Sequence, residues 1–272
     1  MAISSLKCRS LALLIFTVSL SASAQRLPSL QKAGVKAPLN IKIDGKSTEW
    51  RHGLQAYNRA IQAQYTVAND DKRLYLIVRA DKREIINKII NGGISFSINK
   101  NNKKSTDDAV MVTYPIFARG NRPTIGFNHL SEALDNEKDQ KKRDSVMLGY
   151  NNSLEDKAKY IRVNNVPDVD TLISVYNLDG IRAKSGFDDK LVYTVELGID
   201  LKTLNITSAK LVEFTYNIKL NGIALDYVPG IEIFRDAAGN YAGMSGDPKI
   251  AREYYDVSRS DTDLWGEYKP VR

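Results

Sequence analysis

The 272-residue chain is poor in the residues on which most catalytic, metal and redox sites depend. It has one cysteine, Cys8, and two histidines, His52 and His129, which lie far apart in unlike sequence contexts. No HExxH motif or cysteine pair occurs, so the common zinc sites are excluded. No G-x-S-x-G, phosphate-binding or dinucleotide-binding glycine motif occurs either. These absences argue against most familiar enzyme classes.

Long hydrophobic runs are also missing. The longest, Leu11–Leu20, follows two basic residues, precedes the small residues Ser21–Ala24, and is too short to span a bilayer. This three-part pattern predicts a signal peptide over residues 1–24. Cys8 precedes its apolar run and is not at the cleavage point, so we expect a mature chain without cysteine and without a lipid anchor. We expect an exported protein of the periplasm, cell surface or extracellular space, with no transmembrane span.

The net charge is modest. It is +7 for the whole chain, and without Lys7 and Arg9 the 39 basic residues become 37 against 32 acidic ones, a net charge of +5. The one dense basic run, Lys138–Arg143, is interrupted by an aspartate and has no interleaved aromatic residue. It indicates a solvated helix end, and we expect no nucleic-acid partner.

Alternating apolar residues are the main structural signal. The segments Ile61–Val67 and Leu74–Ala80 each place small or large apolar residues at every second position, and the polar turn Asn69–Lys72 joins them. This pattern predicts a β-hairpin with one buried face. Ile41 and Ile43 alternate in the same way just before Asp-Gly, which predicts a short strand at the start of the fold.

Similar segments follow along the chain. Apolar residues at the 85, 86, 89 and 90 positions predict a helix over Lys82–Gly93, and a second helix is expected around Leu130–Lys142. Asn221-Gly222 follows a strand and predicts a hairpin turn. The further predicted strands are Ile94–Ile98, Ala109–Tyr114, Leu172–Tyr176, Ile181–Ser185, Leu191–Leu197, Leu211–Leu220 and Leu264–Lys269.

Many short strands with few helices predict a mainly β protein, an antiparallel β-sandwich with one or two short helices. Residues 25–39 contain two prolines without periodicity and are interpreted as a leader arm. Residues 40–272 are expected to form a single domain. Within it, residues 116–165 are too polar to hold a core of their own and are interpreted as an excursion from the sheet.

Three motifs in this order carry a family resemblance. They are Ile43-Asp44-Gly45 with Glu49-Trp50, Asn69-Asp70-Asp71 with Leu74-Tyr75-Leu76, and Tyr193–Leu197 with Ile199-Asp200-Leu201. Over most of residues 40–270 the chain resembles the family 9 carbohydrate-binding modules and their DOMON-type relatives. Gly92–Ile98 with the Lys/Asn-rich turn after it resembles a variant common in exported Bacteroidetes proteins, which largely lack an assigned function. The resemblance implies a jelly-roll-like sandwich, export and a saccharide ligand.

The same resemblance implies a sugar site built from two tryptophans with amide, carboxylate and arginine partners. Trp50 and Trp265 fall in expected core segments, so we interpret both as packing residues. Tyrosines are the expected substitutes, because any aromatic ring face stacks on a sugar. The candidate ligand-binding residues are therefore loop aromatics with nearby arginine and asparagine: Tyr114, Arg119, Phe127, Arg235, Asn240, Tyr241, Arg252, Tyr254 and Tyr255.

Other ligands are weighed beside the saccharide. Loop carboxylates and carbonyls suit calcium, and Asp70 and Asp107 are the first candidates for a structural ion. Some relatives of this fold bind haem through methionine, histidine or lysine, for which methionines and His129 are present without a paired ligand pattern.

The expected function is therefore non-catalytic binding of a saccharide or glycan by an exported β-sandwich. Two alternatives stay open besides haem binding. One is a cell-envelope module that contacts another protein through residues 116–165. The other is a glycoside-processing enzyme, which needs two carboxylates facing each other across a cleft.

Overall fold

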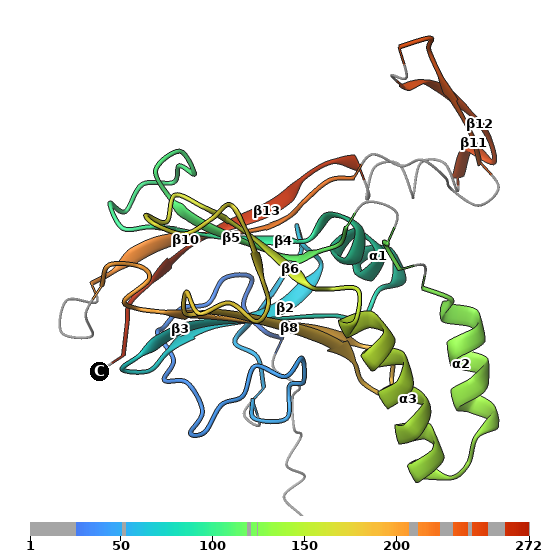
Figure 1. Cartoon of the computed structure of the whole chain (residues 1–272), viewed down its shortest axis with the longest axis horizontal. Helices are drawn as coiled ribbons and strands as arrows, with labels where there is room; N and C mark the ends of the chain where they lie inside the picture. The colour runs from blue at the N-terminus through green and yellow to red at the C-terminus, as the bar shows by residue number, and fades with distance from the viewer. Residues whose placement is uncertain are drawn as a thin grey trace, which may run out of the picture.

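The computed structural model of the chain describes residues 26–50, 53–118, 121–123, 125–206, 212–223, 231–238, 241–249 and 259–271. These residues form an antiparallel β-sandwich, as predicted, with three short helices among them (Figure 1). The predicted hairpin is present, because its two segments pair antiparallel from Gln64↔Arg79 to Asn69↔Leu74.

The first sheet has five strands, all paired antiparallel. In spatial order the strands are β1 (Ala56–Asn58), β2 (Ala63–Asn69), β3 (Arg73–Ala80), β9 (Tyr193–Asp200) and β8 (Ile181–Phe187). The central strand, β3, pairs on one side with β2, its hairpin partner, and on the other side with β9, which comes more than a hundred residues later.

The second sheet has six strands, again all antiparallel, and it lies over the first. In spatial order they are β13 (Thr262–Tyr268), β10 (Phe214–Leu220), β4 (Ile94–Asn99), β5 (Val110–Ile116), β6 (Tyr160–Asn164) and β7 (Leu172–Ser174). A separate two-stranded sheet, β11 (Ile231–Arg235) with β12 (Tyr241–Gly246), projects from the sandwich (Figure 1).

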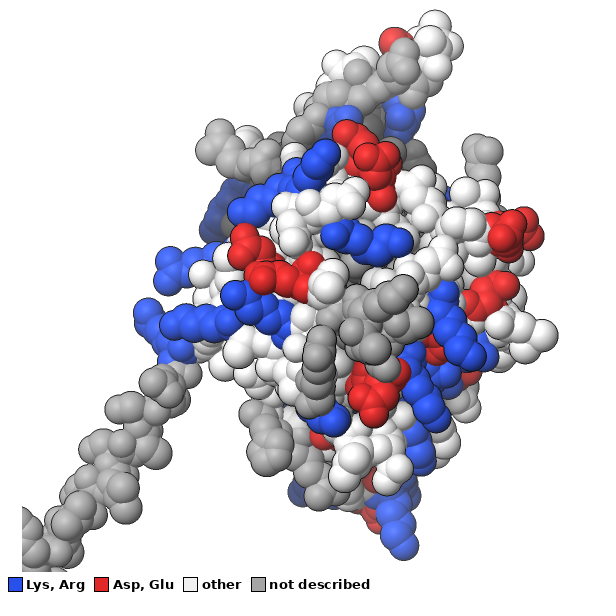
Figure 2. Space-filling model, turned by 90° about the vertical axis from the view of Figure 1, so that its left-hand side faces the viewer, with Lys and Arg blue, Asp and Glu red and all other residues white. Residues whose placement is uncertain are grey.

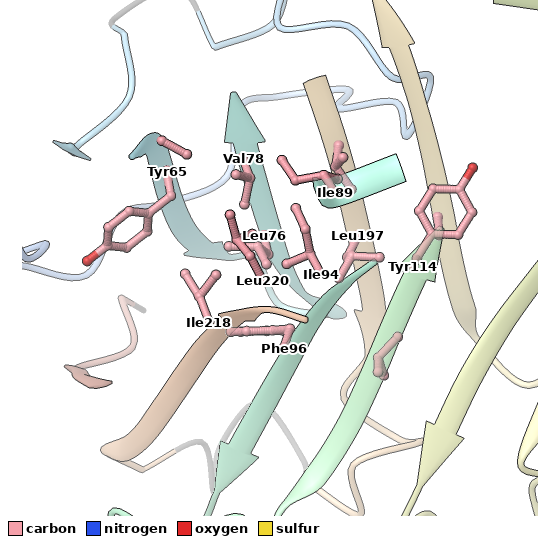
Figure 3. Packing of buried hydrophobic residues seen from close by; sticks show 14 of the residues in the cluster. Tyr65, Leu76, Val78, Ile89, Ile94, Phe96, Tyr114, Leu197, Ile218 and Leu220 are labelled. Carbon is pink, nitrogen blue, oxygen red and sulfur yellow. The ribbon is translucent and has the colours of Figure 1, made fainter. Parts of the chain in front are cut away.

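The core fills the space between the two inner faces. Leu76 and Leu197 of the first sheet meet Phe96 of the second, and all three are fully buried (Figure 3). The hydroxyls of Tyr65 and Tyr216 lie 3.1 Å apart and join the two sheets by a buried hydrogen bond. The every-second-residue pattern therefore marks the residues that hold the layers together.

The helices close one end of this core. α1 (Arg83–Gly92) buries its four isoleucines, as their spacing predicted. The helix expected around Leu130–Lys142 is instead two helices, α2 (Phe127–Asn136) and α3 (Gln140–Glu155). The break occurs because the Asp139 carboxylate accepts hydrogen bonds from the Lys141 and Lys142 N–H groups and caps α3. Both helices contribute side chains to the main core, so this stretch is not a separate unit.

The outer face of the first sheet is covered by residues 27–50 together with residues 53–54, which we call the strap. Trp50 of the strap is buried against Tyr75 and Ile77 of β3. Ile41 and Ile43 pack partly against the same cluster and form no strand, so that prediction was wrong. Their alternation arises because an extended segment lying on a sheet also turns every second side chain toward it.

A single buried carboxylate fastens the strap. Glu196 Oε2 accepts hydrogen bonds from the Asp44 N–H (3.0 Å) and the Gly45 N–H (2.9 Å), and Oε1 accepts one from Trp50 Nε1 (3.0 Å). Gly45 has φ +78°, and a Cβ there would lie 2.6 Å from the Ser185 backbone. The motifs around Ile43-Asp44-Gly45, Trp50 and Glu196 are thus one structural clasp.

The hairpin predicted at Asn221-Gly222 is not formed. β10 pairs with β4 and β13, and the next described strand, β11, pairs with β12. Asn221 instead turns back, and its Nδ2 donates to the Gly92 and Gly93 carbonyls at 3.0 and 3.1 Å. The dipeptide therefore links the end of β10 to the end of α1.

Candidate functional site

The outer face of the second sheet carries a cleft of about 630 Å³, which we call the groove. It is bordered by the end of α1, by residues 115–117 at the end of β5, and by residues 221–223 and 261 beside β10 and β13. Most of its floor comes from β4, β5, β6 and β10. The groove lies on the opposite face of the sandwich from the strap.

The strand register builds the groove. Lys219, Ser95, Thr113 and Arg162 are successive cross-strand partners on β10, β4, β5 and β6, so they form one row on the same face. Neighbouring strands are ~4.8 Å apart, so the Cα atoms of Lys219 and Arg162, at the two ends of this row, are about 14 Å apart. Two short hydroxyl side chains thus lie between two long cationic ones, and a trough results.

The floor is held by a hydrogen-bond network. Ser95 Oγ and Thr113 Oγ1 lie 2.8 Å apart, and Asn221 Nδ2 donates to Ser95 Oγ at 3.0 Å. Because Asn221 is also bonded to the end of α1, the floor, the helix and β10 are positioned together. The polar floor is therefore preorganised.

One of the charged side chains of the groove is neutralised by a partner. Lys219 Nζ lies 3.0 Å from Asp261 Oδ2, and the Gly222 N–H donates to Asp261 Oδ1 at 2.7 Å. Burial by itself raises the pKa of Asp261, but these hydrogen bonds and the charges of Lys219 and Lys88 outweigh it and hold that pKa below its ordinary value. Asp261 is therefore ionised at neutral pH.

The other two cations of the groove, Arg122 and Arg162, are exposed and have no acidic partner among the residues that the structure describes. Away from the groove, positively and negatively charged side chains alternate on the surface. Figure 2 shows basic and acidic side chains interspersed over the end of the sandwich that lies on the left in Figure 1.

Apolar surface borders the polar floor. Phe117, Ile116 and Met111 line the groove and are each half-buried. Tyr160 is the cross-strand partner of Ile116 and is 38% exposed, and Leu172 is the partner of Arg162 and is 52% exposed. Ring faces and methyl groups thus lie beside hydrogen-bond donors, the combination that saccharide sites use.

Trp265 also belongs to this face. It pairs with Asn217 in the next row of the sheet, and it is half-buried while Leu264 and Tyr268 on either side face the core. The interpretation of Trp265 as a core residue was therefore wrong, whereas Trp50 is buried as expected.

The sequence-predicted ligand residues are not gathered in one place. The Tyr114 ring lies in the core layer (Figure 3), where burial raises the pKa of its hydroxyl to about 12. Tyr114 also lines another cleft, of about 400 Å³, and its hydroxyl accepts a long hydrogen bond from Ser185 Oγ at 3.5 Å. Phe127 is buried against Phe187 with the Arg83 guanidinium over its ring.

The remaining predicted residues lie late in the chain or in a loop. Arg235 is exposed on β11, and Tyr241 is the first residue of β12. Arg235 does not line the groove, and the side chain of Tyr241 lies outside the described part of the structure. Arg119, Asn240, Arg252, Tyr254 and Tyr255 lie outside the described residues.

The two candidate calcium ligands have structural roles. Asp70 accepts hydrogen bonds from the Lys72 and Arg73 N–H groups and from the Tyr75 hydroxyl. These bonds hold the turn of the first hairpin. Exposed Asp107 accepts one from Ser105. Within the described ranges, no three histidine, cysteine or acidic residues lie together as a metal-binding group. Structural calcium stays a prediction.

Two other clefts lie along α3 and the edge strand β8. One has a volume of about 650 Å³ and the other, already mentioned, about 400 Å³. Both are lined by Lys184 and Glu155, whose side chains form an ion pair at 2.8 Å. Each cleft has further charged lining residues, among them Lys42 and Arg73 in the smaller one and Asp144 and Asp189 in the larger one.

The chain was compared with protein families, curated proteins and solved structures. No protein-family model and no curated protein matches the chain. Among solved structures, it is similar to a carbohydrate binding module family 9 (CBM9) from Caldicellulosiruptor kristjanssonii in complex with glucose, at TM-score 0.40 and 10% identity, over 88% of this chain and 94% of that one. None of the described helices is long and apolar enough to cross a membrane.

Proposed function

We propose that this chain is an exported, non-catalytic saccharide-binding protein whose ligand lies in the groove. The observation that supports this most directly is the row of Lys219, Ser95, Thr113 and Arg162 beside Phe117 and Tyr160. A sugar ring presents hydroxyls at its rim and C–H groups on its faces, so it needs polar floor and apolar wall together. The groove provides both.

The groove's titratable groups favour binding over catalysis. Among the residues that the structure describes, the groove has one acidic lining residue, Asp261, which is held ionised by Lys219 and Gly222 and cannot act as a general acid near neutral pH. The carboxyl with a raised pKa, Glu196, lies under the strap on the other sheet. A glycosidase needs two carboxyls facing one ligand, and the described lining of the groove has one.

Affinity electrophoresis of the purified chain in gels that contain neutral and acidic polysaccharides, followed by calorimetry on the strongest hit, tests the proposal. We expect binding that Phe117→Ala weakens about tenfold, equivalent to about 1.4 kcal/mol. Arg59→Ala is the control, because Arg59 is exposed on the turn between β1 and β2. If no saccharide retards the wild type, the proposal is wrong.

Incubation with the bound polysaccharide tests the non-catalytic part. Since the described residues place no acid–base pair at the groove, we expect no new reducing ends after prolonged incubation, measured by a reducing-sugar assay. Release that persists in highly purified protein and disappears in a groove variant would show that the chain is an enzyme.

A further inference from the structure

The described lining of the groove has more hydrogen-bond donors on charged side chains than acceptors. Among the described residues, three cations, Arg122, Arg162 and Lys219, line it with one carboxylate, Asp261. Lys219 is engaged by Asp261, whose two oxygens already accept bonds from Lys219 and from the Gly222 N–H. The two guanidinium groups therefore remain as donors without a described acidic partner.

The floor does not supply the missing acceptors. Ser95 and Thr113 share one hydrogen bond, and the Asn221 amide is used by Ser95 and the end of α1. A guanidinium carries five donors and no acceptor, so a ligand that displaces water from these two exposed groups must supply acceptor atoms in its place. Neutral hydroxyls satisfy this demand weakly, whereas a carboxylate or sulfate accepts two parallel bonds from one arginine.

Arg162 is well placed for this contact. It lies on β6 with its cross-strand partners Thr113 and Leu172 on either side, so regular sheet fixes its backbone. Its side chain is exposed at the end of the polar row, about 14 Å from Lys219 across the strands. A sugar seated on the floor between them brings a ring substituent toward the guanidinium.

We infer that the saccharide of this groove is anionic and carries a carboxylate or sulfate that Arg162 and Arg122 bind. The inference rests on the proposed function and specifies its ligand class. Binding is charge-assisted at the arginines, while Phe117 and the apolar border contact the sugar ring. Because the two guanidinium groups are solvent-exposed, the affinity falls as salt rises.

Calorimetry with two matched pairs of polymers tests the inference and distinguishes the two anions. One pair is polygalacturonate and the same polymer with its carboxyls reduced to alcohols. The other pair is dextran sulfate and dextran. Polyglutamate is the probe for a charge without a sugar.

We expect at least one charged polymer to bind ten times or more tightly than its neutral partner. The pair that shows the larger ratio identifies carboxylate or sulfate as the anion. Equal binding of charged and neutral partners would overturn the inference while the proposed function stands. Equal affinity for polyglutamate would also overturn it, and binding of none of the polymers would count against both proposals.

Four variants locate the effect. Arg162→Gln should remove most of the charged-over-neutral ratio without weakening binding of the neutral polymer. Arg162→Lys should keep only part of the ratio, since an ammonium keeps the charge but loses the planar fork. Arg59→Ala should leave the ratio unchanged. A ratio that survives both Arg162→Gln and Arg122→Gln would show that the anion binds elsewhere.

Discussion

At the scale of a residue, Glu196 has the most consequential environment. It is 1% exposed and is bonded to the strap through the Asp44 and Gly45 N–H groups and the Trp50 indole. Burial raises its pKa to about 7, and the three N–H donors offset only part of that rise. The Glu196 carboxyl that holds the clasp together is therefore about half protonated at neutral pH.

The stability of the protein should consequently depend on pH. The folded-state pKa is above the ordinary value of 4.5, so the folded state holds this proton longer than the unfolded state does. The contribution of Glu196 is full below pH 4.5 and declines as pH rises to about 7. Between pH 5 and 8 we expect a loss of about 2–3 kcal/mol of unfolding free energy, measured by urea denaturation.

Glu196→Gln provides the comparison. It should be less stable at pH 5, because an amide N–H now faces N–H donors, and its stability should change less between pH 5 and 8. A variant that shows the same pH dependence as the wild type would place the titrating group elsewhere.

At the scale of an element, α3 protects the exposed edge of the first sheet. β8 is the last strand of that sheet, and its Phe187 N–H donates to Asn151 Oδ1 at 2.8 Å while Asn151 Nδ2 donates to the Phe187 carbonyl at 2.9 Å. The amide of Asn151 thus pairs as a neighbouring strand would. This contact fixes α3 and blocks pairing of the edge with another chain.

Two adjacent asparagines test this role. Asn151→Ala should lower the unfolding free energy by about 1–3 kcal/mol, because it leaves two backbone groups of Phe187 without their partner. Asn152→Ala is the matched control, since Asn152 is exposed on the same turn of α3. Thermal denaturation of both variants gives the measurement, and equal losses would contradict the edge-capping role.

Elements with a strong local pattern were predictable, and those that depend on distant partners were not. The isoleucines of α1 and the alternation of β2 and β3 determine their own buried faces. Ile41 and Ile43 carry the same alternation but lie on the outside of a sheet. Asn221 follows a strand as in a hairpin, yet β10 pairs with β4, from far earlier in the chain, and with β13, from more than forty residues later.

At the scale of the whole molecule, the sandwich has one covered face and one open face. The strap closes the first sheet, and its Gln31 is bonded to β2 through Val67: Nε2 donates to the carbonyl and the Val67 N–H donates to Oε1, both at 2.8 Å. The Val35 carbonyl accepts from the Tyr268 hydroxyl of the second sheet at 3.1 Å. The predicted leader arm is thus part of the folded body.

Gln31→Ala should therefore destabilise the protein by about 1–3 kcal/mol, since both Val67 backbone groups lose their partner in a buried position. Lys32→Ala, an exposed neighbour, should change the unfolding free energy by less than about 0.5 kcal/mol. Saccharide affinity measured at a temperature where both variants are folded should be unchanged, because the strap and the groove lie on opposite faces.

The groove could not be predicted from the sequence for a geometric reason. Ser95, Thr113, Arg162 and Lys219 are ordinary outward residues of four strands, and no spacing along the chain connects them. Only the strand order places them in one row. The candidate residues chosen from the sequence were grouped because they lie near one another along the chain, at positions 114–127 and 235–255. In the structure Tyr114 is in the core and Arg235 is on a separate hairpin.

The anchoring of the last residues near the first sheet has a practical consequence for display of this protein. Asn69 of β2 accepts a hydrogen bond from the Val271 N–H and donates one to the Val271 carbonyl, so the end of the chain leaves beside the strap-covered layer (Figure 1). A carboxy-terminal tag coupled to a sensor chip would hold the molecule by its closed side. Its groove would then point into the flowing solution, where even a long polymer could reach it.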